Sequence, residues 1–156
     1  MKLIKGTNEW FMNEALKEAT KAYIKEEIPV GAVIVKDGKV IARGHNEKER
    51  RNNPLHHAEM AAIQKASKKI GSWRLYGCSL YVTLEPCPMC AGALIQSRVD
   101  RVIIGAPDPK AGAVGSVIDL LADERFNHKV DVVHGILQHE CSKILKDFFA
   151  DLRSRK

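Results

Sequence analysis

Three residues of the chain form the pattern of a catalytic zinc site, and a fourth supplies a free carboxylate. His57 and Glu59 are separated by the single residue Ala58, and Cys87 and Cys90 follow later within the segment PCPMC. A structural zinc site closes with four protein ligands, whereas a catalytic site keeps one position open for water. One histidine and two cysteines fill three positions, which leaves Glu59 free to move protons. We therefore predict a hydrolytic centre with one zinc ion per chain, bound by His57, Cys87 and Cys90.

The local sequence predicts that two helix ends bring these side chains together. Residues 57–67 are rich in helix-forming residues and follow Pro54, so a helix is expected to begin near His57. Positions two apart are rotated by about 200° on a helix, so His57 and Glu59 can converge only beyond its end. The two cysteines share a face, and we expect Pro86 to open their helix. The positive ends of both helices favour thiolate, the form that binds zinc.

The remaining elements alternate between helices and strands after an initial hairpin. Asn8 is expected to cap a first helix that runs to about Lys25. Asp37 and Gly38 are expected to form the tight turn of a β-hairpin. Further strands are predicted around 79–83, 101–105 and 130–133, and further helices near 117–121 and 137–153. This order predicts a three-layer α/β/α sandwich, with a five-stranded mixed sheet and helices on both faces.

Composition narrows the class of protein. The chain has 156 residues, of which 45% are hydrophobic, so we expect residues 1–156 to form one globular domain around the predicted zinc centre. No apolar run approaches the ~20 residues of a membrane span, and no association with a membrane is expected. Two of the four cysteines belong to the C-x-x-C motif, and Cys78 and Cys141 are interpreted as buried apolar residues. This usage favours the reducing cytoplasm.

The charge of the chain favours a polyanionic partner. The formal net charge is +6, and Lys48, Arg50 and Arg51 precede the predicted metal helix. Further basic residues follow that helix and end the chain: Lys65, Lys68, Lys69, Arg74, Arg153, Arg155 and Lys156. Basic clusters beside a candidate site are typical of nucleic-acid binding. A lysine-rich surface without a partner is the alternative, which charge by itself leaves open.

The order H-x-E…P-C-x-x-C is a known signature of zinc-dependent nucleobase deaminases. Over nearly its whole length, the chain resembles the bacterial tRNA-specific adenosine deaminases of the cytidine deaminase superfamily. The resemblance is narrower than the metal motif, because it also includes the segments GAPDPKAGAVGS (105–116), FNH (126–128) and the pair Phe148-Phe149.

The resemblance implies a function and a set of site residues. The family converts the wobble adenosine of a tRNA anticodon to inosine and works as a homodimer. Glu59 would be the proton shuttle, and Asn46 would hydrogen-bond the flipped base. Other substrate-binding positions would be Pro29, Val30, Ala58, Asp108, Asn127 and Phe149. Phosphates of the anticodon stem-loop are expected to contact Lys48, Arg50, Arg51, Lys110 and Arg153.

Two other functions remain open from the sequence. A deaminase of a free base or nucleoside, such as guanine or cytosine, would use the same zinc chemistry. A nucleic-acid-binding module with a structural zinc would need a fourth protein ligand, for which Cys78 and His45 are available. A redox-active C-x-x-C pair would leave His57 and Glu59 unexplained.

Overall fold

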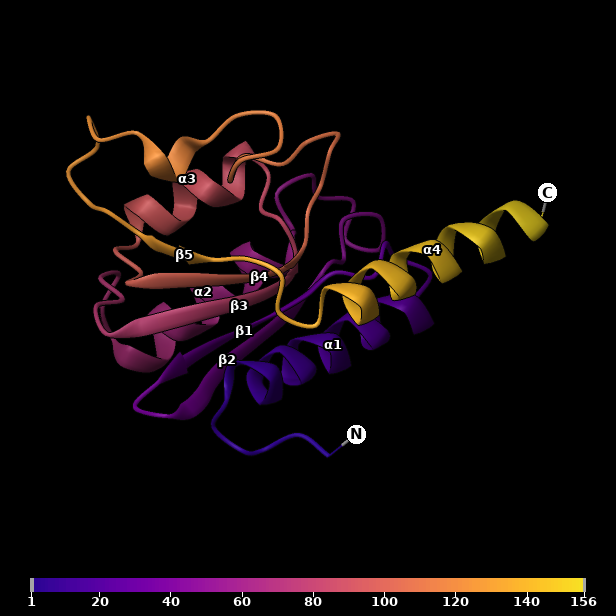
Figure 1. The fold of residues 1–156 in the computed structure, drawn as a ribbon, viewed down its shortest axis with the longest axis horizontal. Coiled ribbons are helices and arrows are strands. Elements are labelled where there is room, and N and C mark those ends of the chain that lie inside the picture. Colours follow the sequence, from indigo (N-terminus) through magenta and orange to yellow (C-terminus); the bar gives the residue numbers. More distant parts are fainter. Residues whose placement is uncertain (1, 156) are drawn as a thin grey trace.

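The computed structural model describes residues 2–155 and places five strands in one mixed sheet (Figure 1). The strands are β1 (Gly31–Lys36), β2 (Lys39–His45), β3 (Cys78–Leu84), β4 (Arg101–Ala106) and β5 (Asp131–Val133). Their order across the sheet is β2-β1-β3-β4-β5. β1 is antiparallel to both of its neighbours, whereas β3, β4 and β5 run parallel. The predicted mixed sheet is confirmed.

Helices cover both faces of this sheet. They are α1 (Asn8–Ile24), α2 (Ala58–Ile70), α3 (Pro88–Gln96) and α4 (Gln138–Ser154). Successive residues of a strand point to opposite faces, so β1 contributes to two separate cores. Ala32 and Ile34 pack with α2 and α3, whereas Val33 packs with α1 and α4. The predicted α/β/α sandwich is therefore confirmed, with α2 and α3 in one layer and α1 and α4 in the other (Figure 1).

The predicted hairpin turn is confirmed by its backbone. Asp37 and Gly38 have φ angles of 51° and 75°, and Lys36 pairs with Lys39 across the turn. Two central residues with positive φ define the turn type whose twist matches that of the flanking strands. The turn therefore sets the register of β1 and β2, and β2 leads into the cavity described below.

The predicted starts of two helices were each wrong by a short distance. Thr7 caps α1 through its hydroxyl oxygen, because the side chain of Asn8 instead accepts a hydrogen bond from Tyr81 at 2.7 Å. In the second metal-binding segment Pro88, not Pro86, is the first helical residue. Proline suits that position because it has no backbone N–H to leave unpaired. The helix therefore begins between the two cysteines.

The helix expected near residues 117–121 was also wrong. In this segment the backbone N–H groups of Val117 and Ile118 both donate to the carbonyl oxygen of Gly112 in the preceding loop, at 2.9 and 3.4 Å. These turn hydrogen bonds leave room for no more than a short 3₁₀ segment, η1 (Leu120–Ala122). Of the apolar residues that suggested a helix, Val117 and Ile118 are exposed and Leu121 is buried.

Close packing holds the start of α2 against the sheet. A Cβ atom on Gly44 of β2 would lie 2.4 Å from the carbonyl oxygen of Ala58 and 2.8 Å from the backbone nitrogen of Ala62. The absence of a side chain therefore lets the first turn of α2 lie directly on β2. Within residues 2–155, none of the helices is both long and apolar enough to span a membrane.

Candidate active site

The residues of the metal motif occupy the starts of two helices. His57 is the N-cap of α2 and Cys87 is the N-cap of α3, and both have extended backbone angles. Neither side chain makes a capping hydrogen bond, so both remain available for other contacts. Cys90 lies in the first turn of α3. The N-terminal ends of α2 and α3 thus bring these three side chains together, as the sequence predicted.

The three side chains converge closely. Nδ1 of His57 lies 3.6 Å from Sγ of Cys87 and 3.5 Å from Sγ of Cys90. The three donor atoms all lie within 4.8 Å of one another, and among residues 2–155 they form the one group with this geometry. One imidazole nitrogen and two sulfurs at this spacing can bind a transition-metal ion.

The side chains of Cys87 and Cys90 differ in protonation because a hydrogen bond joins them. A hydrogen bond from Cys90, together with the imidazole of His57, lowers the pKa of Cys87 to about 4. The same hydrogen bond and burial raise the pKa of Cys90. One sulfur is therefore already a thiolate at neutral pH, and the other holds the proton that a cation would replace.

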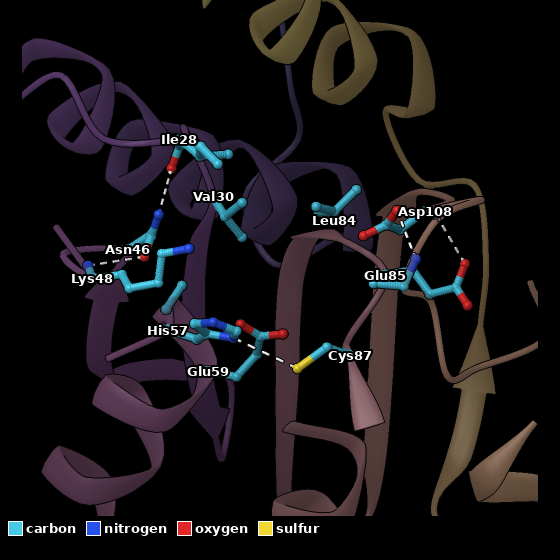
Figure 2. Close-up of a pocket in the computed structure, with 12 residues that line it drawn as sticks. Ile28, Val30, Asn46, Lys48, His57, Glu59, Leu84, Glu85, Cys87 and Asp108 are labelled. Carbon is cyan, nitrogen blue, oxygen red and sulfur yellow. Dashed lines mark hydrogen bonds between the residues drawn. The ribbon is translucent and has the colours of Figure 1, made fainter. Parts of the chain in front are cut away.

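Glu59 lies beside this group without belonging to it (Figure 2). Its side chain is 4% exposed, although it stands in the first turn of α2. Burial raises the pKa of Glu59 to about 7, and the nearby His57 offsets part of that rise. A carboxyl group with such a pKa can both accept and release a proton near neutral pH.

A cavity of about 160 Å³ opens above Glu59. Pockets for drug-sized ligands usually measure about 300–1,000 Å³, so this one suits a smaller group such as a single base. Figure 2 shows Asn46 and Lys48 on one side and Glu85 and Asp108 on the other. The complete lining is Ile28, Val30, Asn46, Lys48, His57, Ala58, Glu59, Leu84, Glu85, Cys87, Asp108 and Ala111.

The structure places Asn46 in the wall of the cavity with hydrogen-bonding capacity to spare. Its amide nitrogen donates to the carbonyl of Ile28 at 3.2 Å, and its amide oxygen accepts from the backbone of Lys48 at 3.1 Å. Each group can make one further hydrogen bond. These contacts fix the direction of the amide, which therefore offers one donor and one acceptor.

Other predicted substrate residues lie outside the cavity. Pro29 is buried between two residues that line it. Asn127 lies in a separate hollow beside Phe126, and Phe149 is exposed on α4. The predicted phosphate contacts are spread over the surface. Arg50, Arg51 and Lys110 are exposed on loops beside the cavity, Arg153 is exposed on α4, and the terminal Lys156 lies outside the described residues.

Neither proposed fourth ligand joins the metal-binding group within residues 2–155. Cys78 is fully buried at the start of β3. His45 lies 3.0 Å from Nζ of Lys25 and 3.4 Å from a carboxylate oxygen of Glu18. Within residues 2–155 the group therefore has three candidate protein ligands, one fewer than a closed structural site needs, which weakens the interpretation as a structural zinc module.

Sequence reasoning missed one prominent residue of the cavity, Glu85. Its carboxylate is buried and accepts hydrogen bonds from the backbone of Asp108 at 3.0 Å, Val114 at 2.9 Å and Ser116 at 3.2 Å, and from the hydroxyl of Ser116. Although burial by itself would raise it, these hydrogen bonds hold the pKa of Glu85 below its ordinary value. The available signal was its position two residues before Cys87.

Comparison with known proteins agrees with this geometry. The MafB19-like deaminase family matches residues 6–153. The tRNA-specific adenosine deaminase of Bacillus subtilis (strain 168) is 53% identical over 149 residues, which cover 96% of this chain and 92% of the relative. The tRNA-specific adenosine deaminase of Aquifex aeolicus (strain VF5) is 46% identical, with 94% of this chain and 96% of the relative covered.

Solved structures of deaminases also resemble this chain. A structure from a study of A-to-I editing by tRNA:A34 deaminases at the wobble position superposes with a TM-score of 0.84 and 45% identity. That match covers 86% of this chain and 98% of the other. Guanine deaminase from Bacillus subtilis superposes with a TM-score of 0.63 and 33% identity, covering 95% of this chain and 94% of the other.

Proposed function

This chain belongs to the tRNA-specific adenosine deaminases of the MafB19-like deaminase family, and we propose that it converts the wobble adenosine of a tRNA anticodon to inosine. The observation that carries this proposal is the buried carboxyl of Glu59 beside a three-ligand metal group, at the floor of a base-sized cavity. The reaction adds water at C6 of adenine and releases ammonia.

The donor set of His57, Cys87 and Cys90 fits a zinc ion. Tetrahedral zinc with bonds of about 2.0 Å to nitrogen and 2.3 Å to sulfur keeps those ligand atoms about 3.5 Å apart. The corresponding distances in the protein are 3.5 and 3.6 Å. When bound, zinc would act as a Lewis acid and make its water acidic near neutral pH.

Glu59 moves the protons of the reaction. It accepts a proton from the attacking water and donates it to N1 of the adenine ring, which makes C6 a better electrophile. It then accepts the proton of the hydroxyl group added at C6 and passes it to the amino group, which departs as ammonia while the C6 carbonyl forms. Its burial keeps bulk water away from this transfer.

The walls of the cavity hold the base in place. Val30 and Ala58 offer apolar surface to the ring, and the free donor and acceptor of Asn46 can bind its polar edge. Because the base must leave its stack to enter, a single-stranded anticodon loop is a cheaper substrate than a duplex.

The RNA around the target base would lie on the rim of the cavity and beyond it. Lys48, Arg50 and Arg51, here named the rim cations, can contact phosphates, as can Lys110 and Arg153. Asp108 lines the cavity and would contact the target nucleotide. Pro29, Asn127 and Phe149 would contribute to a wider substrate groove, since a stem-loop extends well past the cavity.

We further propose that the enzyme works as a homodimer in the cytoplasm. A groove between α2 and α3, lined by Ile63, Ala93 and Trp73, leaves apolar surface uncovered in the single chain, and Trp73 is 53% exposed. None of the cysteines within residues 2–155 forms a disulfide, which suits a reducing compartment. Light scattering of the purified protein would give its subunit number.

An assay for inosine decides between RNA and free bases as substrate. The purified protein should form inosine in bulk tRNA and in an anticodon stem-loop, and should leave free adenosine, guanine and cytosine unchanged. A stem-loop with guanosine in place of the wobble adenosine is the matched control. Deamination of free guanine without any inosine in tRNA would overturn the proposal.

A further inference from the structure

Two loops form opposite sides of the cavity mouth. The first rim loop, residues 47–53, carries Lys48, and the second rim loop, residues 108–116, carries Asp108. Neither loop contains a helix or a long strand, and turn hydrogen bonds within each loop, such as Arg51 N–H to Glu47 O at 3.0 Å and Gly112 N–H to Asp108 O at 2.9 Å, satisfy only part of its backbone. In addition, at least two further backbone N–H groups of each loop donate to one buried carboxylate.

Glu27 holds the first rim loop. It is 2% exposed, and its two carboxylate oxygens accept from the backbone N–H groups of Glu49 at 3.1 Å and Arg50 at 2.7 Å. Its own backbone N–H donates to Ala22 at the end of α1 at 2.9 Å. Glu27 therefore ties this loop to a helix that is distant in sequence.

Glu85 holds the second rim loop in the same way. Both of its oxygens accept hydrogen bonds from that loop, which lies so close that a Cβ on Gly112 would come within 2.3 Å of one of them. A residue larger than glycine at position 112 would push the carboxylate and the loop apart. The fit between the two is therefore specific.

These two carboxylates differ from other buried glutamates of the protein. Glu14 and Glu18 pair with Lys17, Lys21 and Arg43, whereas no ion pair within residues 2–155 involves Glu27 or Glu85. A buried carboxylate without a cation is tolerated when backbone N–H groups solvate it. Their charge is thus compensated by the very loops that they hold.

We propose that Glu27 and Glu85 are positioning residues that fix the two rim loops in the shape that receives RNA. This inference rests on the proposed function, because the loops carry the residues expected to contact the substrate. Neither residue takes part in the proton transfers. They act through Lys48 and Asp108, one on each side of the entering nucleotide.

Replacement by glutamine tests the proposal with little change in volume. In the wild type, both oxygens of each carboxylate accept hydrogen bonds from backbone N–H groups. In Glu27→Gln and Glu85→Gln, one oxygen becomes an NH₂ group, which faces a backbone N–H and leaves it without an acceptor. Hydrogen exchange should become faster at residues 49 and 50 in the first variant, and at 108, 114 and 116 in the second. Each variant should loosen its own loop and leave the other protected. Unchanged exchange in both would overturn the proposal.

Kinetics measure the consequence for RNA. Each variant should raise KM for an anticodon stem-loop about tenfold, the effect of losing a hydrogen bond to a charged group, while kcat changes less and bound zinc stays at the wild-type level. Gly112→Ala should reproduce the effect of Glu85→Gln with the carboxylate intact. Glu14→Gln is the matched control, because Glu14 pairs with the side chains of Lys17 and Arg43 and not with loop backbone, and it should keep the wild-type KM and loop protection.

The outcomes separate this inference from the function on which it rests. If the wild-type protein forms no inosine in tRNA, the proposed function fails, and the positioning role in catalysis fails with it. If the wild type is active and both variants keep its KM, this inference alone is wrong. An equal rise of KM in Glu14→Gln would show general destabilisation and would also refute it.

Discussion

Replacing Glu59 by glutamine should abolish deamination while leaving the metal site and the fold in place. The substitution keeps the size of the side chain and removes the group that accepts and donates protons. Glu59 is not one of the three convergent ligands, so zinc content should stay at one ion per chain. RNA affinity should also persist, since phosphate contacts and stacking do not depend on this carboxyl.

The size of the loss follows from the surroundings of Glu59. General acid–base catalysis is worth about 10²–10⁴-fold, and Glu59 serves both the addition and the departure of ammonia. Other carboxylates of the cavity cannot replace it, because Glu85 is engaged by backbone N–H groups and Asp108 accepts from its own loop at 3.0 and 3.3 Å. We therefore expect a loss near 10⁴-fold, which corresponds to about 5 kcal/mol in activation free energy.

Single-turnover inosine formation on an anticodon stem-loop, with metal analysis of the same preparation, measures this loss. Glu140→Gln is the matched control, because Glu140 occupies the first turn of α4 but is exposed there. That variant should keep the wild-type rate. A zinc-loaded Glu59→Gln protein that works within tenfold of the wild type would refute the mechanism.

Three further predictions address the metal, the RNA and the fold. Cys87→Ala and Cys90→Ala should each lose zinc and activity together, and full zinc occupancy in both variants, by metal analysis, would contradict the ligand assignment. The affinity for RNA should fall as the salt concentration rises. Neutralising the rim cations should reduce the slope of log K against log salt by about 0.7–0.9 per lost phosphate contact. A slope that does not change would show that the rim cations do not contact phosphates. Burial by itself would raise the pKa of Glu18, but hydrogen bonds from His45 and Lys21 lower it from 4.5 to about 2. The contribution of ionised Glu18 to the stability of the fold is therefore complete above pH 4.5 and is lost as the pH falls towards 2. Urea unfolding should therefore show Glu18→Gln to be less stable than the wild type by about 2–3 kcal/mol at pH 7 and nearly equal at pH 2, and an equal difference at both pH values would contradict this.

Local patterns in the sequence were sufficient to predict much of the framework. The Asp37-Gly38 turn, the start of α2 near His57 and the alternation of strands and helices depend on neighbouring residues, and the structure has all three. The metal-binding group was also predictable, because the two short motifs can bind one ion only if the ends of their helices meet. Its chemistry therefore follows from residue types and spacing.

The tertiary structure decided how the cavity is bounded and held. Glu27 gave no local signal of its role, and Glu85 gave only its position two residues before Cys87. Their partners at 49–50 and 108–116 lie far along the chain and lack regular secondary structure. The expected helix near 117–121 failed for the same reason, since its N–H groups bond to a preceding loop. Hydrogen bonds of this kind depend on how distant loops pack together, and spacing along the sequence does not encode that packing.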